Sequence, residues 1–355
     1  MIGMSTTLSQ MATVNSSMSN STTSSMTSGS SAGLGIAILS LALVLGFPGN
    51  AFVIWTVLTQ VKKRTVTCIL ILHLAIADLV VILTAPIFIH FLSTGSWAFG
   101  NVICKICHYV GNLSMYASIF LITFMSLDRF FAVAKPFTSQ KVRTKPVVRS
   151  IVFSIWILAT LFAIPMPIYR SVETLNNRQL CITVRGKGDG VKHHMVFQFT
   201  FETLIGFIIP FTIILSCYIY IGKRLQNARF QTKHKTSRLV IMIILTFALF
   251  WLPYHVVNML QVSGELSLSE SLRKASRFAR PNATALAFLS SSINPILYVF
   301  AGGNFIRTAG FGFMARLFEA SGSEANSIRK VSQVFQQRSR KQSTEQGKLK
   351  ETVED

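Results

Sequence analysis

Seven apolar stretches, each long enough to cross a lipid bilayer as a helix, constrain this chain more than any other feature. They lie at residues 34–59, 66–92, 102–134, 147–169, 195–221, 238–262 and 281–301. Inside a bilayer every backbone polar group must be satisfied within the structure, which leaves helices or closed barrels. The alternation of apolar and polar residues that barrel strands require is absent from these stretches. The sequence therefore predicts an all-α membrane protein, a bundle of seven transmembrane helices.

Lys and Arg residues divide unevenly between the two ends of such a bundle. Apart from Arg129, 23 of them fall in the connections after the first, third and fifth spans and in the tail, against ten on the other side. Cytoplasmic loops carry the excess of Lys and Arg. We therefore expect a multi-pass plasma-membrane protein with an extracellular amino terminus and a cytoplasmic tail. The net charge of +21 follows mostly from this asymmetry, so nucleic-acid binding is not expected.

The two ends of the chain lack the composition of a packed domain. Residues 1–33 are rich in Ser, Thr, Met and Gly and contain no apolar core of a cleaved signal peptide, so we expect a disordered extracellular segment. Asn15 and Asn20 begin Asn-x-Ser/Thr acceptors for glycosylation. After the seven-span domain at 34–301, we expect an amphipathic helix along the membrane at 302–320 and a disordered cytoplasmic tail at 321–355.

The five cysteines suit an oxidising outer compartment and an apolar bundle. Cys104 starts the third span and Cys181 lies in the second outer loop, so we expect these two to form a disulfide. Cys68 and Cys217 fall within spans, where a thiol packs as a small apolar group. Cys104 and Cys107 have the spacing of a redox or metal pair, but no second ligand pair accompanies them, which disfavours that reading.

Two short motifs occupy the inner ends of two spans. Asp128-Arg129-Phe130 closes the third span, and Asn294-Pro295-Ile296-Leu297-Tyr298 lies near the end of the seventh. A solvated helix end would explain either motif alone. Together, among seven apolar spans, they resemble the rhodopsin-like G-protein-coupled receptors, with Phe130 replacing the usual Tyr. The resemblance implies that Asp128 restrains Arg129 until activation releases it toward a G protein, and that Tyr218 and Tyr298 lock the opened inner end.

The sixth span contains a built-in bend. Pro253 removes a backbone donor and kinks a helix. Trp251, two residues earlier, resembles the family's rotamer switch, although a Trp beside a Pro also occurs as plain packing.

Asp78 lies in the middle of the second span. An ionised carboxylate there costs about 2.5–3.5 kcal/mol on insertion scales, so we expect it to be neutral or to have a partner. The family resemblance implies a sodium and water cluster, and no other cofactor; the alternative is a hydrogen-bonded structural group. The residues that would surround Asp78 are Asn50, Ser118, Ser290 and Asn294.

Polar side chains gather toward the outer third of the spans, where a ligand would bind. Two arginines and a histidine at one mouth favour an anionic, hydroxylated ligand, whereas an isolated Arg at a helix end more often reaches out to lipid headgroups. Gly111 offers no counter-ion for an amine, and Phe288 replaces the Lys that retinal needs. The candidate ligand-binding residues are His108, Met115, Arg170, Glu202, Trp251, Tyr254, Asn258 and Arg280.

A closer resemblance, to the leukotriene B4 receptors, covers about residues 46–327. It rests on Leu83–Pro86, His108–Val110, Ser114–Ser118, Trp251–Asn258, Ala287–Ser292 and Leu317–Ala325. The Asp-Arg pair and the run Tyr254–Asn258 favour the first subtype over the second. The resemblance implies a carboxylated, dihydroxylated eicosanoid as ligand, with the carboxylate at Arg170 or Arg280 and the polyene between Met115 and Trp251. It also implies an inhibitory-type G protein, arrestin and receptor kinases as partners, in chemotaxis and inflammation. Gln198 departs from the His expected there, which leaves fine ligand preference open.

Other classes of membrane protein find less support. A transporter or channel would show internal repeats, paired broken helices or a polar stripe along a pore. An enzyme would need a nucleophile elbow, a phosphate loop or a set of metal ligands, and no such motif is present, so no catalysis is expected. The remaining alternative is a receptor for another chemoattractant, either a peptide or a different lipid acid.

Overall fold

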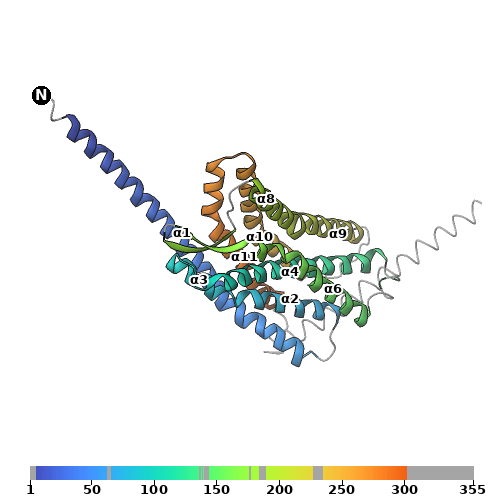
Figure 1. The fold of residues 1–355 in the computed structure, drawn as a ribbon. Coiled ribbons are helices and arrows are strands. Elements are labelled where there is room, and N and C mark those ends of the chain that lie inside the picture. The colour runs from blue at the N-terminus through green and yellow to red at the C-terminus, as the bar shows by residue number, and fades with distance from the viewer. Residues whose placement is uncertain are drawn as a thin grey trace, which may run out of the picture.

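The computed structural model describes a long helical bundle crossed at one end by a short hairpin (Figure 1). It describes the backbone of residues 5–61, 65–135, 137, 139, 144–175, 177–183, 189–226 and 235–301. Side chains are described from Ala32 to Leu297, with residues 189–192 and 225–240 as further gaps.

The elements follow one another as the seven spans predict, with each span built from one or more helices. In chain order they are α1 (Ser5–Thr59), α2 (Val66–Ile82), α3 (Ala85–Thr94), α4 (Gly100–Ala134), α6 (Lys145–Ala163), α7 (Pro165–Ile168), β1 (Arg170–Leu175), β2 (Arg178–Thr183), α8 (Asp189–Thr203), η1 (Leu204–Ile208), α9 (Ile209–Gln226), α10 (Lys235–Leu266) and α11 (Glu270–Ala301).

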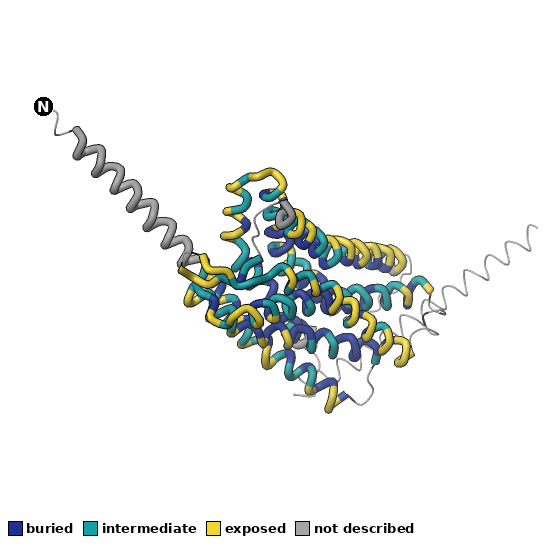
Figure 2. Tube along the Cα trace, in the orientation of Figure 1, coloured by how far each residue is buried: buried dark blue, intermediate teal, exposed yellow. Residues whose placement is uncertain are grey.

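The membrane character of the bundle is confirmed. Within the described residues, six helical segments are long and apolar enough to span a bilayer, and α11 is the seventh helix of the bundle. Exposed apolar side chains such as Leu215, Leu245 and Leu249 cover the outside, while buried residues gather inside (Figure 2). Apolar side chains on the outside suit a protein whose solvent is lipid.

Three spans contain interruptions that the apolar pattern does not show. The stretch predicted at 66–92 breaks between α2 and α3, where Thr84 Oγ1 donates to the Val81 carbonyl at 2.7 Å and Pro86 follows. The stretch at 147–169 breaks between α6 and α7 at Pro165. Proline lacks the backbone N–H that would continue a helix. In the fifth span, η1 is a π-helical turn between α8 and α9.

Helix α11 begins earlier than its apolar stretch. The predicted start at residue 281 is wrong, because α11 is helical from Glu270 and contains Pro281. Its first turns are polar and pack against the outer end of α10 rather than against lipid. Hydropathy alone therefore missed about three outer turns.

Helix α4 lies at the centre of the bundle and contacts α2, α6, α9 and α10. Its buried residues Met115, Ile119 and Ile122 belong to the main core, together with Leu74 of α2 and Phe247 of α10. A central helix that touches most others ties the outer end of the bundle to its inner end.

Helix α1 packs closely on α11. A Cβ added at Gly49 would lie 2.8 Å from Cβ of Pro295. Only glycine lets the two backbones approach so closely there. Asn50, fully buried, donates from Nδ2 to the Ser291 carbonyl at 3.0 Å. These contacts fix the inner half of α11, where the Asn-Pro motif lies.

Strands β1 and β2 form an antiparallel hairpin that pairs Val172 with Cys181. The Cys104–Cys181 disulfide is confirmed and fastens this hairpin to the top of α4. Trp97, almost fully buried, packs beside it and donates from Nε1 to the Gly100 carbonyl at 2.9 Å. The hairpin is thereby held across the end of the bundle.

The amino-terminal part of α1 differs from the sequence prediction. The backbone of α1 is helical from Ser5, whereas the composition of residues 1–33 predicts disorder. In Figure 1 this part of α1 extends away from the bundle. It can do so because the backbone hydrogen bonds of a helix form within the helix itself and need no neighbouring element. The side chains of Asn15 and Asn20 and the segments expected at 302–320 and 321–355 lie outside the described residues, so those assignments stay predictions.

Candidate functional site

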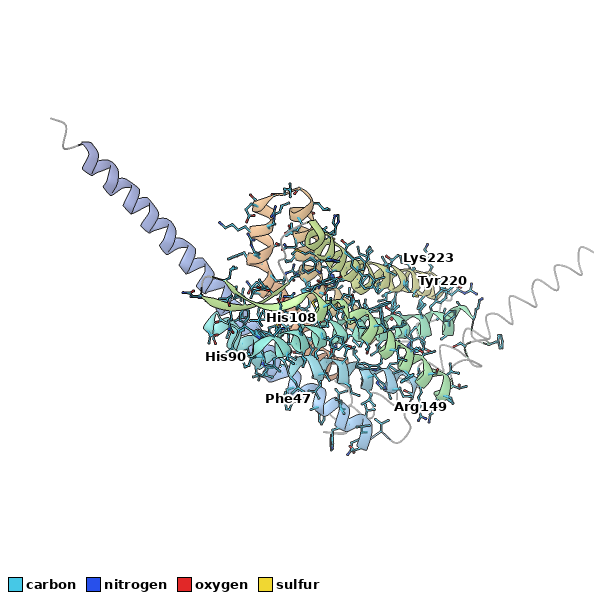
Figure 3. The ribbon with its side chains drawn as sticks, viewed as in Figure 1. Phe47, His90, His108, Arg149, Tyr220 and Lys223 are labelled. Carbon is cyan, nitrogen blue, oxygen red and sulfur yellow. A yellow bond between two sulfur atoms is a disulfide. The ribbon has the colours of Figure 1, made fainter. Side chains whose placement is uncertain are left out.

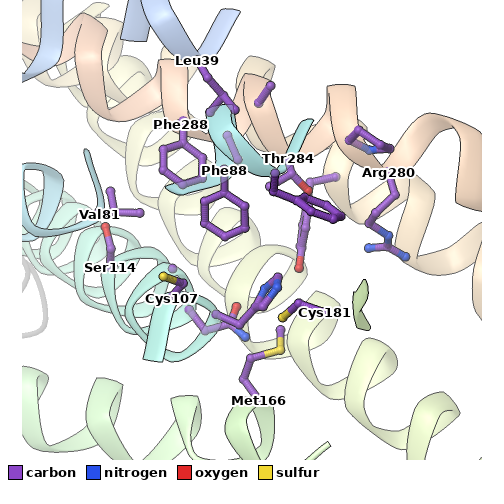
Figure 4. A pocket seen from close by; sticks show the side chains of 18 of the residues that line it. Leu39, Val81, Phe88, Cys107, Ser114, Met166, Cys181, Arg280, Thr284 and Phe288 are labelled. Carbon is purple, nitrogen blue, oxygen red and sulfur yellow. The ribbon is translucent and has the colours of Figure 1, made fainter. Parts of the chain in front are cut away.

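A cavity opens among the outer halves of the helices, beneath the β1–β2 hairpin (Figure 4). It is lined by side chains from α1, α2, α3, α4, α7, β1, β2, α10 and α11. They are Leu39, Val81, Phe88, Phe91, Leu92, Trp97, Cys107, His108, Gly111, Asn112, Ser114, Met166, Arg170, Cys181, Trp251, Tyr254, Arg280, Pro281, Thr284, Ala285, Ala287, Phe288 and Ser291. A concave, mostly apolar cavity with a few polar groups is the usual form of a small-molecule site.

Arg280 supplies one positive charge to this cavity. Its guanidinium donates to Asn258 Oδ1 on α10 and lies over the rings of Phe199, at 4.7 Å, and Tyr254, at 5.5 Å. Aromatic faces attract a cation and hold it in place. Arg280 therefore faces into the bundle and does not extend outward to lipid headgroups.

Arg170 supplies a second positive charge from the first residue of β1. Burial lowers the pKa of its guanidinium to about 10, so it remains protonated at neutral pH. Within the described part of the chain, its Nε has no hydrogen-bond partner. A buried, charged donor without a partner is costly unless an acceptor comes to it. Arg170 is thus ready to bind an anionic group.

A pair of hydrogen bonds joins the fifth and sixth spans behind the cations. Tyr254 donates to Glu202 Oε1 at 2.9 Å, and His255 Nδ1 lies 3.3 Å from Thr203 Oγ1. Glu202 is buried, and its Oε2 has no partner among the described residues. Tyr254 lines the cavity, so this network offers hydrogen bonds to the hydroxyl groups of a ligand.

The opposite part of the cavity is apolar. Leu39, Val81, Ala285 and Phe288 come from one buried cluster between α1, α2 and α11, and Phe88 of α3 packs against it. Figure 4 shows Leu39, Val81 and Phe288 apart from Arg280. The cavity therefore has a cationic end and an apolar end.

The structure brings most of the predicted ligand residues together. His108, Arg170, Trp251, Tyr254 and Arg280 line the cavity. Glu202 and Asn258 lie one contact behind, bonded to Tyr254 and Arg280.

Met115 does not lie where the sequence predicts. It is fully buried, and in the described structure it is absent from the cavity wall. A Cβ added at Gly206 would lie 2.8 Å from Met115 Cε, so the side chain packs against the π turn η1. Met115 lies on the same face of α4 as His108 and Asn112, which line the cavity, and differs from them in its depth along the helix.

Sequence reasoning missed most of the apolar lining, including Phe88, Phe91 and Trp97. These residues look like ordinary core in an apolar span, and no pattern separates a cavity wall from a packed interior. Gln198, the expected departure, is buried and donates from Nε2 to Met166 Sδ at 3.2 Å. It therefore lies behind Met166, which does line the cavity.

Asp78 lies deeper in the bundle, buried between α2 and α11. Asn294 Nδ2 donates to Asp78 Oδ2 at 2.7 Å. Ser118 and Ser291 face the same carboxyl group, and Ser118 Oγ has no hydrogen bond within the described residues. Carboxylate and hydroxyl oxygens are ligands that a hard cation accepts, so these residues fit a sodium ion. Ser290 is buried, but its neighbour Ser291 is the serine beside Asp78.

The inner end of the bundle holds Arg129 in a buried position. Its Nη2 donates to Thr67 Oγ1 of α2 at 2.8 Å. Tyr218 of α9 interacts electrostatically with Arg129. Phe130 packs against Tyr220, with ring centroids 5.0 Å apart. The side chain of Tyr298 lies outside the described residues, so its predicted role stays a prediction.

Comparison with known proteins gives a consistent result over most of the chain. Residues 49–298 match the family described as 7 transmembrane receptor (rhodopsin family). Leukotriene B4 receptor 1 of Homo sapiens is 49% identical over 302 residues, 84% of this chain and 85% of that receptor. Leukotriene B4 receptor 2 of Homo sapiens is 40% identical over 297 residues, 81% of each. The C3a anaphylatoxin chemotactic receptor of Oncorhynchus mykiss is 35% identical over 278 residues, 77% of this chain and 74% of that receptor.

Proposed function

Since this chain belongs to the rhodopsin family of seven-transmembrane receptors, we propose that it is a receptor for leukotriene B4 that signals through an inhibitory-type G protein. The observation that carries the proposal is the cavity, which places two arginines at one end and an apolar cluster at the other. A carboxylated lipid has the same division between an anionic head and an apolar chain. Identity to the leukotriene B4 receptors supports this choice of lipid acid.

The ligand's carboxylate would bind Arg170 or Arg280. A carboxylate that leaves water needs charge-assisted hydrogen bonds, and a guanidinium fork provides two. The hydroxyl groups would pair with His108 and with Tyr254, whose own hydroxyl is bonded to Glu202. The polyene would extend toward Leu39 and Phe288 rather than toward Met115, because Met115 packs away from the cavity.

Binding would reach the inner end through α10. Trp251 lines the cavity and stacks on Phe247 one turn below, with ring centroids 5.6 Å apart. Pro253 lies between Trp251 and the bonded pair at Tyr254 and His255. A ligand that moves Trp251 therefore acts beside the kink of α10. Opening of the inner end of α10 would make room for a G protein beside Arg129, which would then leave Thr67 of α2.

Radioligand competition on membranes tests the ligand. We expect leukotriene B4 to displace a labelled lipid-acid antagonist at concentrations well below those of other eicosanoids or of formyl peptides. A C3a-derived peptide is a further competitor, because an anaphylatoxin receptor is also a relative. Displacement by a peptide and not by leukotriene B4 would replace the proposed ligand with a chemoattractant peptide.

Signalling is tested in cells that express the receptor. Agonist is expected to lower cyclic AMP, and pertussis toxin is expected to abolish the response. Arg129→Ala is expected to remove the signal while ligand binding persists, since Arg129 lies far from the cavity on the inner end of α4. Undiminished pertussis-sensitive signalling in Arg129→Ala would contradict the mechanism. Arrestin and receptor kinases remain proposed partners, with candidate sites in the tail at Ser321, Ser323, Ser339, Ser343 and Thr344.

A further inference from the structure

Three polar contacts join the outer halves of α10 and α11, one above another. Arg280 donates to Asn258, Ser276 Oγ donates to Gln261 Oε1 at 2.6 Å, and Arg273 Nη1 lies 3.9 Å from Glu265 Oε2. The partners on α10 are three and four residues apart, and those on α11 are four and three apart. Such spacing keeps each set on one face of its helix. We call these three contacts the α10–α11 ladder.

The middle contact is partly buried and is linked to the upper one. Ser276 is fully buried, although it lies in the polar outer turns of α11. Gln261 Nε2 donates to Glu265 Oε1 at 2.9 Å, so the side chains form a continuous chain from Ser276 to Arg273. A buried hydrogen bond is costly to break when one partner stays behind without another. The ladder therefore resists rotation of one helix against the other.

The backbones of the two helices also approach closely beside the ladder. A Cβ added at Gly264 would lie 3.0 Å from the backbone nitrogen of Arg273. Two helices that touch along their backbones and share three polar contacts have a defined relative rotation.

Arg280 is the lowest member of the ladder and the one that reaches the cavity. Arg280 immediately precedes the apolar stretch that begins at residue 281, a place where an arginine would ordinarily extend toward lipid headgroups. Its direction here depends on the rotation of α11 about its own axis, which the contacts above it fix. We propose that Ser276 and Gln261 are positioning residues that aim the Arg280 guanidinium into the cavity, toward the carboxylate of the ligand. This inference rests on the proposed function.

The test compares two serine variants of the intact receptor. Ser276→Ala removes the middle contact one turn from Arg280, whereas Ser263→Ala removes an exposed hydroxyl of α10 outside the ladder. Loss of one buried hydrogen bond is expected to weaken leukotriene B4 binding about fivefold in Ser276→Ala, with no change in Ser263→Ala. Gln261→Met, which keeps the side-chain length and loses the hydrogen bonds with Ser276, Glu265 and Met195, is expected to behave like Ser276→Ala.

A change of ligand head separates positioning from a general loss of structure. The methyl ester of leukotriene B4 lacks the anionic head, so its affinity is expected to be the same in wild type and Ser276→Ala. In an Arg280→Gln background, Ser276→Ala is expected to have no further effect, because a residue that acts through Arg280 has nothing left to position. Equal losses for acid and ester, or additive losses with Arg280→Gln, would overturn the proposal.

A ligand-free measurement keeps this inference distinct from the proposed function. Backbone amides of α11 near Arg280 are expected to exchange hydrogen faster in Ser276→Ala than in Ser263→Ala. If wild type binds no leukotriene B4, the proposed function fails and this exchange decides the ladder alone. Identical exchange in the two variants would overturn the ladder whatever the ligand.

Discussion

Arg170 and Arg280 bring two guanidinium groups to one cavity, and the two groups differ in the partners that they already have. Arg280 already has Asn258 and two aromatic rings as partners. Arg170 has an unpartnered Nε within the described structure, and its lowered pKa of about 10 leaves it charged at neutral pH. A ligand carboxylate would gain more from Arg170, since it would compete with no existing acceptor at that nitrogen.

Arg170→Gln should therefore weaken leukotriene B4 binding by about 1.5–3 kcal/mol, roughly tenfold to a hundredfold, the range for hydrogen bonds to charged groups. Arg178→Gln is the matched control, because Arg178 is exposed at the far end of the same hairpin. Saturation binding at equal surface expression measures both. Unchanged affinity in Arg170→Gln would assign the carboxylate to Arg280 alone.

Asp78 leads to a second prediction at this scale. A sodium ion held by Asp78, Ser118 and Ser291 would favour the bundle without agonist, so sodium should weaken agonist binding severalfold, within the typical coupling of about 1–3 kcal/mol. Asp78→Asn should abolish the difference between sodium and choline buffers. Ser291→Ala should reduce it more than Ser290→Ala, since Ser291 is the serine beside the carboxyl group. A full sodium effect in Asp78→Asn would exclude the site.

At the scale of the elements, the closeness of α10 and α11 predicts that replacing glycine by alanine changes stability in opposite directions at Gly264 and Gly222. Alanine in place of glycine inside a helix usually stabilises by about 1 kcal/mol. At Gly264 the new Cβ would meet the backbone of α11, and overpacking costs about 1–3 kcal/mol. At Gly222 of α9 nothing lies within 4 Å of such a Cβ.

Gly264→Ala should therefore lower the thermal unfolding temperature of the detergent-solubilised receptor, and Gly222→Ala should leave it unchanged or raise it. Agonist affinity should fall only in Gly264→Ala, because that variant also disturbs the helix that carries Arg280. Equal stability of the two variants would show that the outer turns of α10 and α11 are not tightly packed.

At the scale of the whole molecule, the prediction concerns direction in the membrane. His90 lies at the hairpin end of the bundle, and Arg149 and Lys223 lie at the other end (Figure 3). The basic end is expected in the cytoplasm. An epitope tag at the amino terminus should stain intact cells, and a tag on the tail should require permeabilisation. Staining of the tail on intact cells would reverse the orientation.

Much of the fold could be predicted from the sequence, because a membrane restricts the secondary structures that can span it. Length and hydropathy located the spans, and the oxidising outer side located the Cys104–Cys181 disulfide. The charged and polar residues of the cavity were found because ionisable groups in apolar spans are conspicuous.

Rotation and packing were the parts that sequence did not give. Met115 packs against the π turn η1, and Ser291 rather than Ser290 faces Asp78. Adjacent residues on a helix differ by about 100° in direction, so a small error in rotation exchanges one for the other. The outer turns of α11 were missed because their partners are polar side chains of α10, which hydropathy does not detect.

The single wide turn at Leu204–Ile208 has a consequence for both ends of the fifth span. A π turn inserts one residue, which shifts the helical phase of everything after it by about 100°. Glu202 and Thr203, before it, contact Tyr254 and His255, whereas Tyr218, beyond it, interacts electrostatically with Arg129. One rod of uniform pitch would align only one of these faces with its partner. The wide turn lets the ligand end and the G-protein end of the same helix each keep their own phase.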